Sequence, residues 1–562
     1  MIRKRSGKII SAVLAAVMAL GMAACGSSST GTTASSDAAV AGSTAEAVAS
    51  GSAAGIETGD DIVNIAFTDT VGTLNPLNMN WNFINLYATS MEFLPLAQTN
   101  DNYDVDYLLA ESITTNDNQT FTIKIRDDAK WSDGEPVTAD DVVWTMMKFT
   151  SPAVANPNFD FTPFVGINDD GTSPEGAEDV EGIRAVDDKT VQLKVKDHMN
   201  LKTLLNNCIT WLCILPKHAL EDTPDDQLLT SSWFEKPDVV SGAYFVTDYD
   251  FSHYVSYTAN DNYFLGAPSI KKVNFRIMDG SEILSGLQSG ELDMVHPSCS
   301  IPAEDRDAVE KLEGFDVEYT KPITNQMTFF NTSKVIDARV RQAVVYAIDR
   351  DTIVQQLLKG HGEVTDGFIC SESPYYNADK TKITYDPDKA KELLQEAGWD
   401  GSQTLQYYVS SNDTIAVQAA QLVQQYLAQV GITCKINTVD FDTLTGQIAG
   451  SDDEDMFSVQ YTITPNDYWA DENSLINVPD SSWSGGYVND DISKWLDQTQ
   501  ETTDENELKT IYNEIDEQVI ADTPVFPMYF LSNLGVVSNR VSGAKMTFYG
   551  AFDNIQDWKI VS

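Results

Sequence analysis

The thiol of Cys25 has the most specific chemical setting in this sequence. It follows Ala23-Ala24 at the end of a short apolar stretch, Ile9 to Leu20, which four basic residues precede. A basic segment, a short apolar segment and small residues before the cut are typical of a secretory signal. A cysteine directly after Ala24 resembles the bacterial lipobox, in which the thiol receives a diacylglycerol. We predict a lipoprotein signal peptide over residues 1–24 and a lipid anchor on Cys25; an ordinary signal peptide with an incidental cysteine is the alternative.

Residue patterns that would carry catalysis do not occur. The sequence has no H-E-x-x-H, G-x-S-x-G, Walker A or G-x-G-x-x-G motif, and its five histidines lie far apart. The acidic run 452–455 lacks the glycine and the spaced ligands of a calcium loop, so we interpret it as a solvated turn. We therefore predict no catalytic residue, no metal and no cofactor. Because the two carboxylates of a glycosidase come from distant positions, an exported hydrolase stays open as an alternative.

Composition places further limits on function. Residues 26–59 are almost entirely Ser, Thr, Ala and Gly, which bury too little apolar surface to fold, so we expect a lipidated N-terminus and flexible tether over residues 25–59. After the signal, 32 Lys and Arg face 84 Asp and Glu, a net charge of −52. Such a chain has no basic surface for phosphates, which argues against nucleic acid.

The remaining cysteines do not form the framework of a disulfide-rich domain, because they are odd in number and scattered over a large body. Cys208 and Cys213 are near enough in sequence to form a disulfide, but the sequence is equally consistent with two buried free thiols. The five are Cys208, Cys213, Cys299, Cys370 and Cys434.

Helical and strand patterns alternate along the body. Apolar residues alternate with polar ones over 121–125, 191–195 and 273–277, as in half-buried strands. Helix starts are indicated by the capping residues Thr138, Ser281, Asp386, Asp413 and Asp504, and helix ends by glycines at 290, 398 and 431. Mixed elements in this order indicate an α/β or α+β fold.

Four stretches of sequence together resemble one family. They are Leu109 to Ser112 with TFTIKIRDDAKWSDGEPVTADDVVWT (120–145); SGAYFVTDYD (241–250) through LQSGELDMV (287–295); FFNTSKVIDARVRQAVVYAIDRDTIV (329–354); and YDPDKAKELLQEAGW (385–399). Their order and spacing resemble the extracytoplasmic solute-binding proteins of peptide-type ABC importers, the oligopeptide/dipeptide/nickel-binding family. We interpret Trp131, Arg339 and Arg341 within them as scaffold residues.

The resemblance implies a two-lobed α/β fold of the periplasmic-binding-protein type (class II, cluster C), with a ligand cleft at the hinge. Lobe 1 would combine residues 60–97, 233–320 and 528–562, with an inserted subdomain at 98–232. Lobe 2 would be residues 321–527, and crossovers near 320 and 528 would form the hinge. Closure would bury the ligand between the lobes.

The resemblance also implies where a ligand binds. Peptide-binding members hold the peptide's amino group with an acidic residue in the second lobe, and the aligned residue here is Asp467, with slippage allowing Asn466 or Tyr468. Trp469 belongs to the same segment. Tyr529 stands where an aromatic lies near the hinge, and Asn80, Trp81 and Asn82 form the approaching loop of the first lobe. Core roles remain the alternative for the aromatic residues.

The expected function is to capture an oligopeptide at the outer face of the bacterial cell membrane and deliver it to an ABC permease and its ATPases. The chain would work as a lipid-anchored monomer that does not bind nucleic acid. An oligosaccharide or a metal chelate in the same fold remains open, because aromatic and amide side chains serve sugars equally well.

Overall fold

The structure is a computed structural model that describes residues 59–79, 81–154, 156, 158–411, 413–469, 477 and 483–561. These residues belong to one compact unit that begins at Thr58. The predicted signal peptide, Cys25, the tether before Gly59, and Asn80 lie outside the described residues. None of the helices in the described part combines the length and the apolar character that spanning a bilayer requires.

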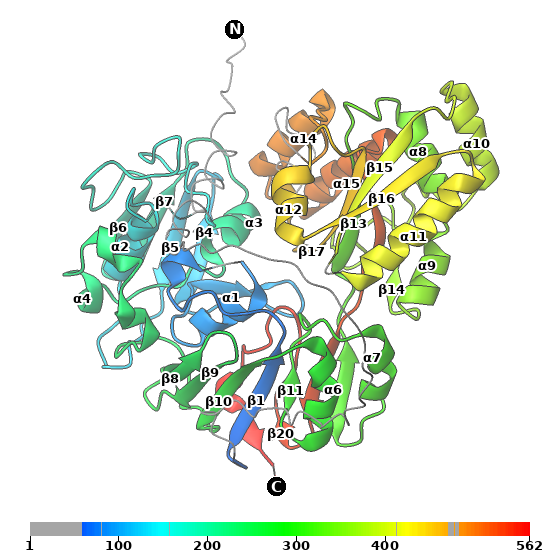
Figure 1. The fold of residues 1–562 in the computed structure, drawn as a ribbon. Helices are drawn as coiled ribbons and strands as arrows, with labels where there is room; N and C mark the ends of the chain where they lie inside the picture. The colour runs from blue at the N-terminus through cyan, green and yellow to red at the C-terminus, as the bar shows by residue number, and fades with distance from the viewer. Residues whose placement is uncertain are drawn as a thin grey trace, which may run out of the picture. The chain divides into compact units, whose positions relative to one another are not determined.

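A seven-stranded mixed sheet organises the first lobe, in the order β12-β19-β11-β1-β10-β9-β8. Strand β1 lies inside it, pairs in parallel with β10 and β11, and is buried along its whole length, as internal parallel strands are. Helix α1 (Phe83–Ser90), α6 (Gly280–Ser289) and α7 (Ala303–Val309) belong to this lobe (Figure 1). The strands are β1 (Ile62–Phe67), β8 (Tyr244–Asp250), β9 (Tyr254–Ala259), β10 (Lys272–Ile277), β11 (Met294–Val295), β12 (Phe315–Tyr319) and β19 (Leu534–Ser538); short elements are a 3-10 turn (Pro76–Asn78), β20 (Val541–Ser542), a 3-10 turn (Ile555–Asp557) and β21 (Lys559–Ile560).

A separate four-stranded antiparallel sheet, β4-β5-β7-β6, lies within the predicted inserted subdomain. The predicted strands at 121–125 and 191–195 are its inner pair, and Trp131 is buried, as predicted for a scaffold residue. Thr138 and Asp141 form the capping box that starts α2. The elements are β2 (Ala97–Thr99), β3 (Val105–Tyr107), β4 (Ala110–Thr115), β5 (Thr120–Ile125), α2 (Ala139–Phe149), β6 (Ile183–Asp187), β7 (Thr190–Lys194), α3 (Leu201–Leu204), a π-helical turn (Leu205–Ile209), α4 (Lys217–Leu220), α5 (Asp225–Leu228) and a 3-10 turn (Ser232–Glu235).

A six-stranded sheet in the order β14-β18-β13-β17-β15-β16 organises the second lobe. Helices α8 to α11 share one hydrophobic core with one of its faces, and α14 and α15 share another core with the opposite face. The strands are β13 (Thr324–Phe330), β14 (Gly362–Glu363), β15 (Thr404–Ser410), β16 (Thr433–Val439), β17 (Met456–Thr462) and β18 (Val525–Leu531). The helices are α8 (Ala338–Ala347), α9 (Arg350–Leu357), α10 (Pro387–Glu396), α11 (Thr414–Gln429), α12 (Phe441–Thr443) with a π-helical turn (Leu444–Ile448), α14 (Asp490–Glu501) and α15 (Glu505–Asp522).

Most of the predicted helix starts are confirmed. The side chains of Asp386, Asp413 and Asp504 each accept a bond from a backbone N–H in the first turn of α10, α11 and α15. The prediction for Ser281 is wrong, because α6 begins at Gly280 after Asp279 and Ser281 lies inside the helix. The glycine predicted to end that helix, Gly290, does so with a left-handed φ of 76°.

The two arginines interpreted as scaffold residues do bind loops. The guanidinium of Arg341, which is 4% exposed, donates to four backbone carbonyls, those of Val335, Ile336, Asp522 and Thr523. Arg339 pairs with Asp337 at the helix start. All five cysteines in the described part are buried free thiols, so Cys208 and Cys213 do not bridge.

The chain passes between the two large sheets twice, and both passages are short. It leaves β12 at Tyr319 and enters β13 at Thr324, and it leaves β18 at Leu531 and enters β19 at Leu534. The predicted crossover near 528 therefore falls inside β18, and the passage itself is at 532–533. The strand ends are five and three residue steps apart, which span at most about 18 Å and 11 Å, so the two sheet edges that they join lie close together.

Candidate functional site

The two sheet edges that face each other are those at which the parallel strands end. In the first lobe β1, β10 and β11 are parallel, and in the second lobe β15, β16 and β17 are parallel. Strand β13 starts beside the end of β17, with Thr324 opposite Thr462. Ligands of α/β sheets bind outside the carboxyl ends of such strands. The described residues that follow these ends, which we call the interlobe segments, are 68–79, 81–82, 278–280, 296–302, 411, 413, 440–443 and 463–469.

Asp467 lies in the last interlobe segment and is 7% exposed. Its Oδ1 accepts bonds from the Tyr512 hydroxyl at 2.9 Å and the Trp469 amide at 3.2 Å. Its Oδ2 is buried without a hydrogen-bond partner among the described residues. Burial raises the pKa of Asp467, and the nearby Lys202 ammonium and Thr203 hydroxyl oppose that rise. Oδ1 thus holds the carboxylate in place, whereas Oδ2 makes no hydrogen bond among the described residues although the Thr203 hydroxyl lies near the carboxylate.

Asn466 joins the two lobes directly. Its Nδ2 donates to the Tyr103 carbonyl at 2.6 Å, and its Oδ1 accepts from Asn206 Nδ2 at 3.2 Å. Both partners belong to the predicted inserted subdomain. Because both ends of the amide are engaged by protein, the structure places Asn466 in an interlobe contact.

The two aromatic residues beside Asp467 have different surroundings. Tyr468 is fully buried, and its hydroxyl accepts a bond from the Cys370 amide at 3.3 Å. Trp469 is half-buried and packs against the same core. Tyr468 therefore supports the loop that carries Cys370. Of these two aromatic side chains, only that of Trp469 is partly exposed.

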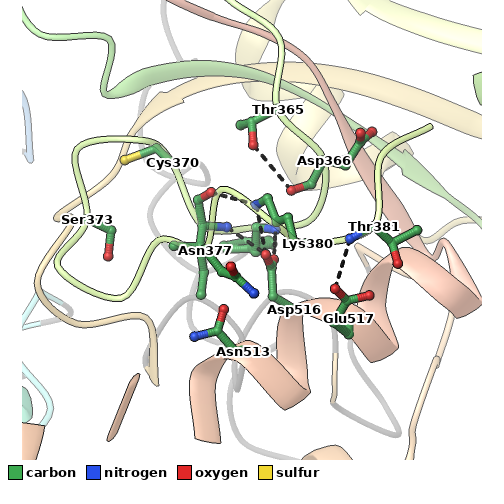
Figure 2. A network of polar contacts seen from close by, with 12 residues as sticks. Thr365, Asp366, Cys370, Ser373, Asn377, Lys380, Thr381, Asn513, Asp516 and Glu517 are labelled. Atoms are coloured by element: carbon green, nitrogen blue, oxygen red, sulfur yellow. Dashed lines mark hydrogen bonds and ion pairs between the residues drawn. The ribbon is translucent and has the colours of Figure 1, made fainter. Parts of the chain in front are cut away.

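That loop, residues 364–384, is held by two buried ion pairs. Lys380 Nζ lies 2.8 Å from Asp516 Oδ2 on α15, and Arg350 Nη2 lies 2.6 Å from Asp366 Oδ1. Figure 2 shows Asp516 reaching the loop from its helix, with Lys380 beside it. Gly367 has a φ of 74°, and a Cβ there would collide with the Asp516 carboxylate, so glycine is required.

The predicted first-lobe residues lie in the segment after β1. Trp81 is 45% exposed, its Nε1 donates to the Asn158 carbonyl at 3.2 Å, and its ring lies 5.5 Å from that of Phe159. The Asn82 side chain instead caps α1, because its Oδ1 accepts from the Asn85 amide at 2.9 Å. Trp81 thus has an exposed aromatic surface whose position is fixed by its contacts with Asn158 and Phe159. The side-chain oxygen of Asn82, in contrast, already accepts a hydrogen bond.

Tyr529 lies on β18, where it is fully buried, and its hydroxyl has no hydrogen-bond partner among the described residues. Two charged residues that the sequence did not single out as site residues lie in its electrostatic surroundings, Asp413 and Arg306. Asp413 was predicted only as a helix cap. Asp413 follows β15, a strand that runs parallel to both of its neighbours. That position at the carboxyl end of a parallel strand was the feature of the sequence from which Asp413 could have been predicted as a site residue.

Residues of the inserted subdomain also bind the turn between α14 and α15. Asn118 Nδ2 donates to the Gln500 carbonyl at 3.0 Å, and Asn200 Nδ2 donates to the Thr502 carbonyl at 2.7 Å. The Asn200 amide donates to Gln500 Oε1 at 2.9 Å, and Lys202 pairs with Glu505 at 2.9 Å. Asn118 and Asn200 are 1% and 6% exposed. These hydrogen bonds and this ion pair therefore join the two lobes at this place.

No cluster of three His, Cys, Asp or Glu side chains suited to a metal ion occurs in the described part of the chain. A surface hollow of about 560 Å³ lies between α14 and α15, lined by Gln498, Glu501, Thr502, Glu507, Thr510 and Ile511. None of its lining residues belongs to the interlobe segments. The interlobe segments, with one half-satisfied carboxylate and an exposed indole, form the better candidate site.

Comparison with known proteins gives the family. Residues 104–486 match the model described as bacterial extracellular solute-binding proteins, family 5 middle. The chain belongs to this family. It is 26% identical over 514 residues to the oligopeptide-binding protein AppA of Bacillus subtilis, covering 85% of this chain and 89% of AppA. It is 25% identical over 467 residues to the periplasmic oligopeptide-binding protein OppA of Escherichia coli, covering 77% and 81%.

Structural comparison agrees with the family. The ABC transporter substrate-binding protein CtaP of Listeria monocytogenes superposes with a TM-score of 0.76 and 25% identity, over 89% of this chain and 99% of CtaP. This confirms the predicted two-lobed α/β fold of the solute-binding proteins. The positions of the ligand-contacting residues stay a prediction.

Proposed function

We propose that this chain captures oligopeptides between its two lobes and delivers them to an ABC permease, as a monomer held at the outer face of the cell membrane by a lipid on Cys25. Oligopeptide binding by AppA and OppA, the relatives named above, supports the choice of ligand. In this proposal the chain binds its ligand and releases it unchanged.

The observation that carries the proposal is the buried Oδ2 of Asp467, which makes no hydrogen bond among the described residues while Oδ1 is fixed by Tyr512. A buried carboxylate oxygen without a donor is costly, and the ammonium of a peptide N-terminus supplies both a charge and three N–H groups. Such charge-assisted bonds are about twice as strong as neutral ones. The exposed face of Trp81 would then contact a ligand side chain from the other lobe.

Isothermal titration of the purified chain against a peptide library and an oligosaccharide panel tests the proposal. We expect saturable binding of peptides and a loss of roughly 30-fold or more in affinity for Asp467→Asn. Asp452→Asn, which changes an exposed carboxylate in a turn, is the matched control. Binding of sugars alone would replace the ligand class, and cleavage of a bound ligand, followed by mass spectrometry, would favour the hydrolase.

A further inference from the structure

His361 lies where the chain passes between the two lobes. Its amide donates to the Leu358 carbonyl at 2.8 Å, and its carbonyl accepts from the Ser532 amide at 3.2 Å. Ser532 belongs to the second passage, which bonds to the first, because the Thr320 amide donates to the Asn533 carbonyl at 2.8 Å. The backbone of His361 is therefore tied to the two segments that connect the lobes.

The imidazole ring of His361 contacts the other lobe. It stacks on the ring of Tyr319, the last residue of β12, with centroids 3.7 Å apart and planes 6° from parallel. Its Nε2 lies 3.5 Å from Oε1 of Glu310, which directly follows α7. The Tyr319 hydroxyl donates to the same carboxylate oxygen. A ring of the second lobe thus contacts both an aromatic face and a carboxylate of the first.

A second ion pair holds the same two segments together. Lys359 Nζ lies 2.6 Å from Asp307 Oδ1 on α7. Lys359 has a φ of 53°, a left-handed conformation that is uncommon outside glycine, so its place in this turn is specific. The turn 358–361 therefore contacts the α7 segment at two points. We call the five side chains involved the His361 cluster; they are Asp307, Glu310, Tyr319, Lys359 and His361.

Histidine is the residue of this cluster that ordinarily gains or loses its proton between pH 5 and 8. The His361 side chain is 35% exposed, so solvent protons can reach it. The hydrogen bond from Lys359 lowers the pKa of Asp307, and burial raises the pKa of Tyr319, so neither changes charge in that range. The charged and titratable groups around the ring are Arg306, Asp307, Glu310 and Lys311 in or directly after α7, Tyr319 on β12, and Lys359 in the same turn.

The His361 cluster is formed together with other contacts between the lobes. Asn466 bonds to Tyr103 and to Asn206 of the inserted subdomain, and Asn200 bonds to Thr502 in the turn between α14 and α15. The cluster therefore belongs to a conformation in which the lobes touch. A ligand that contacts both lobes would stabilise that same conformation.

We infer that protonation of His361 strengthens the His361 cluster, so that the two lobes come together more readily in mildly acidic than in mildly alkaline solution. Protonation adds a charge that the Glu310 carboxylate attracts, and a cation stacks favourably on the face of Tyr319. It also places an N–H on both ring nitrogens, so Nε2 always carries a hydrogen. The charge of Lys359 does not cancel the attraction, because its ammonium is paired with Asp307.

Proton binding and closure therefore favour each other, since the ring has these neighbours only while α7 contacts the turn. The consequence for ligand affinity rests on the proposed function, whereas the consequence for the arrangement of the lobes does not. The two are measured separately.

Small-angle scattering of the ligand-free protein at about pH 5 and about pH 8 tests the arrangement of the lobes. The radius of gyration of the wild type should increase from the lower to the higher pH, and it should increase less in His361→Gln and in Glu310→Gln. His253→Gln is the matched control, because His253 pairs with Asp250 at 3.0 Å within the first lobe and is also partly exposed. The control should expand as much as the wild type.

Isothermal titration with peptides that bind the wild type tests the affinity. The ratio of wild-type affinity to His361→Gln affinity should be roughly three- to tenfold greater at the lower pH than at the higher. Taking this ratio at each pH removes the titration of groups that both proteins share. Circular dichroism of each variant at both pH values establishes that the fold is retained.

The outcomes separate this inference from the proposed function. A ratio that does not change with pH, or an expansion that is undiminished in His361→Gln, overturns the role of His361 and leaves peptide binding intact. Failure of the wild type to bind any peptide at either pH overturns the proposed function, and the scattering comparison then decides the role of His361 by itself.

Discussion

Lys380 and Asp516 form an ion pair of 2.8 Å with side chains that are only 1% and 2% exposed. The Lys380 ammonium also donates to the Ile369 carbonyl, and Asp516 Oδ1 accepts from the Phe368 and Ile369 amides. Every atom of the pair that needs a partner has one. The pair therefore fixes the loop that carries Cys370 (Figure 2). The Cys370 amide in turn bonds to Tyr468, the neighbour of Asp467.

Lys380→Met should destabilise the protein by about 3–5 kcal/mol, because it leaves the Asp516 carboxylate buried without its counter-charge. Urea unfolding followed by circular dichroism measures the change. Lys389→Met removes an exposed pair with Glu392, which water screens, so its effect on the free energy of unfolding should be far smaller. Equal effects of the two substitutions would contradict a structural role for the buried pair.

Glu92 gives a pH-dependent prediction. It is fully buried, one oxygen accepts from the Val246 amide at 2.9 Å, and burial raises its pKa from 4.5 to about 8. A raised carboxyl pKa means that the folded state holds a proton that the unfolded state releases above pH 4.5. Its contribution to stability is therefore complete below pH 4.5 and is lost as the pH rises towards 8.

Glu92→Gln should consequently gain stability relative to the wild type between pH 5 and pH 8, by on the order of 4 kcal/mol over the full range. Urea unfolding of both proteins at the two pH values gives the difference. Comparison with the wild type at each pH removes the general effect of the large negative charge. If the difference in unfolding free energy between the variant and the wild type does not increase with pH, Glu92 is ionised in the folded protein.

The contact between Asn200 and the α14–α15 turn predicts a link between closure and binding. Asn200→Ala removes the bonds to the Thr499 and Thr502 carbonyls. If the contact forms only when the lobes close, peptide affinity should fall by roughly tenfold and small-angle scattering should show a larger radius for the free protein.

Asn168→Ala, at an exposed side chain that bonds to Thr172, serves as the control. Unchanged affinity and radius in Asn200→Ala would mean that the contact joins the lobes permanently.

Cys25→Ser predicts the consequence of losing the proposed anchor. The substitution removes the thiol that would carry lipid, so the protein should appear in the medium or periplasm with its peptide affinity unchanged. Fractionation followed by titration of the released protein measures both properties. A single acyl chain binds membranes only reversibly, so the anchor requires more than one chain. Continued membrane retention of the variant would contradict anchoring through Cys25.

The sequence alone determined the local features. Asp413 and the Asp386-Pro387 pair begin helices as predicted, and the alternating strands form, because caps and side-chain periodicity act over a few residues. The motif order across the chain was enough to indicate the family. The burial of Trp131 and the carbonyl contacts of Arg341 also followed from the motifs that contain them.

Only the tertiary structure decided which polar groups face the space between the lobes. Asn200 and Thr502 are about 300 positions apart and are hydrogen-bonded because the chain crosses between two lobes that pack against each other. The family resemblance implied ligand contacts at Asn82 and Asn466, and the fold gives the side chains of both residues protein partners. Whether a polar group is satisfied depends on every segment that packs around it, and no local pattern contains that information.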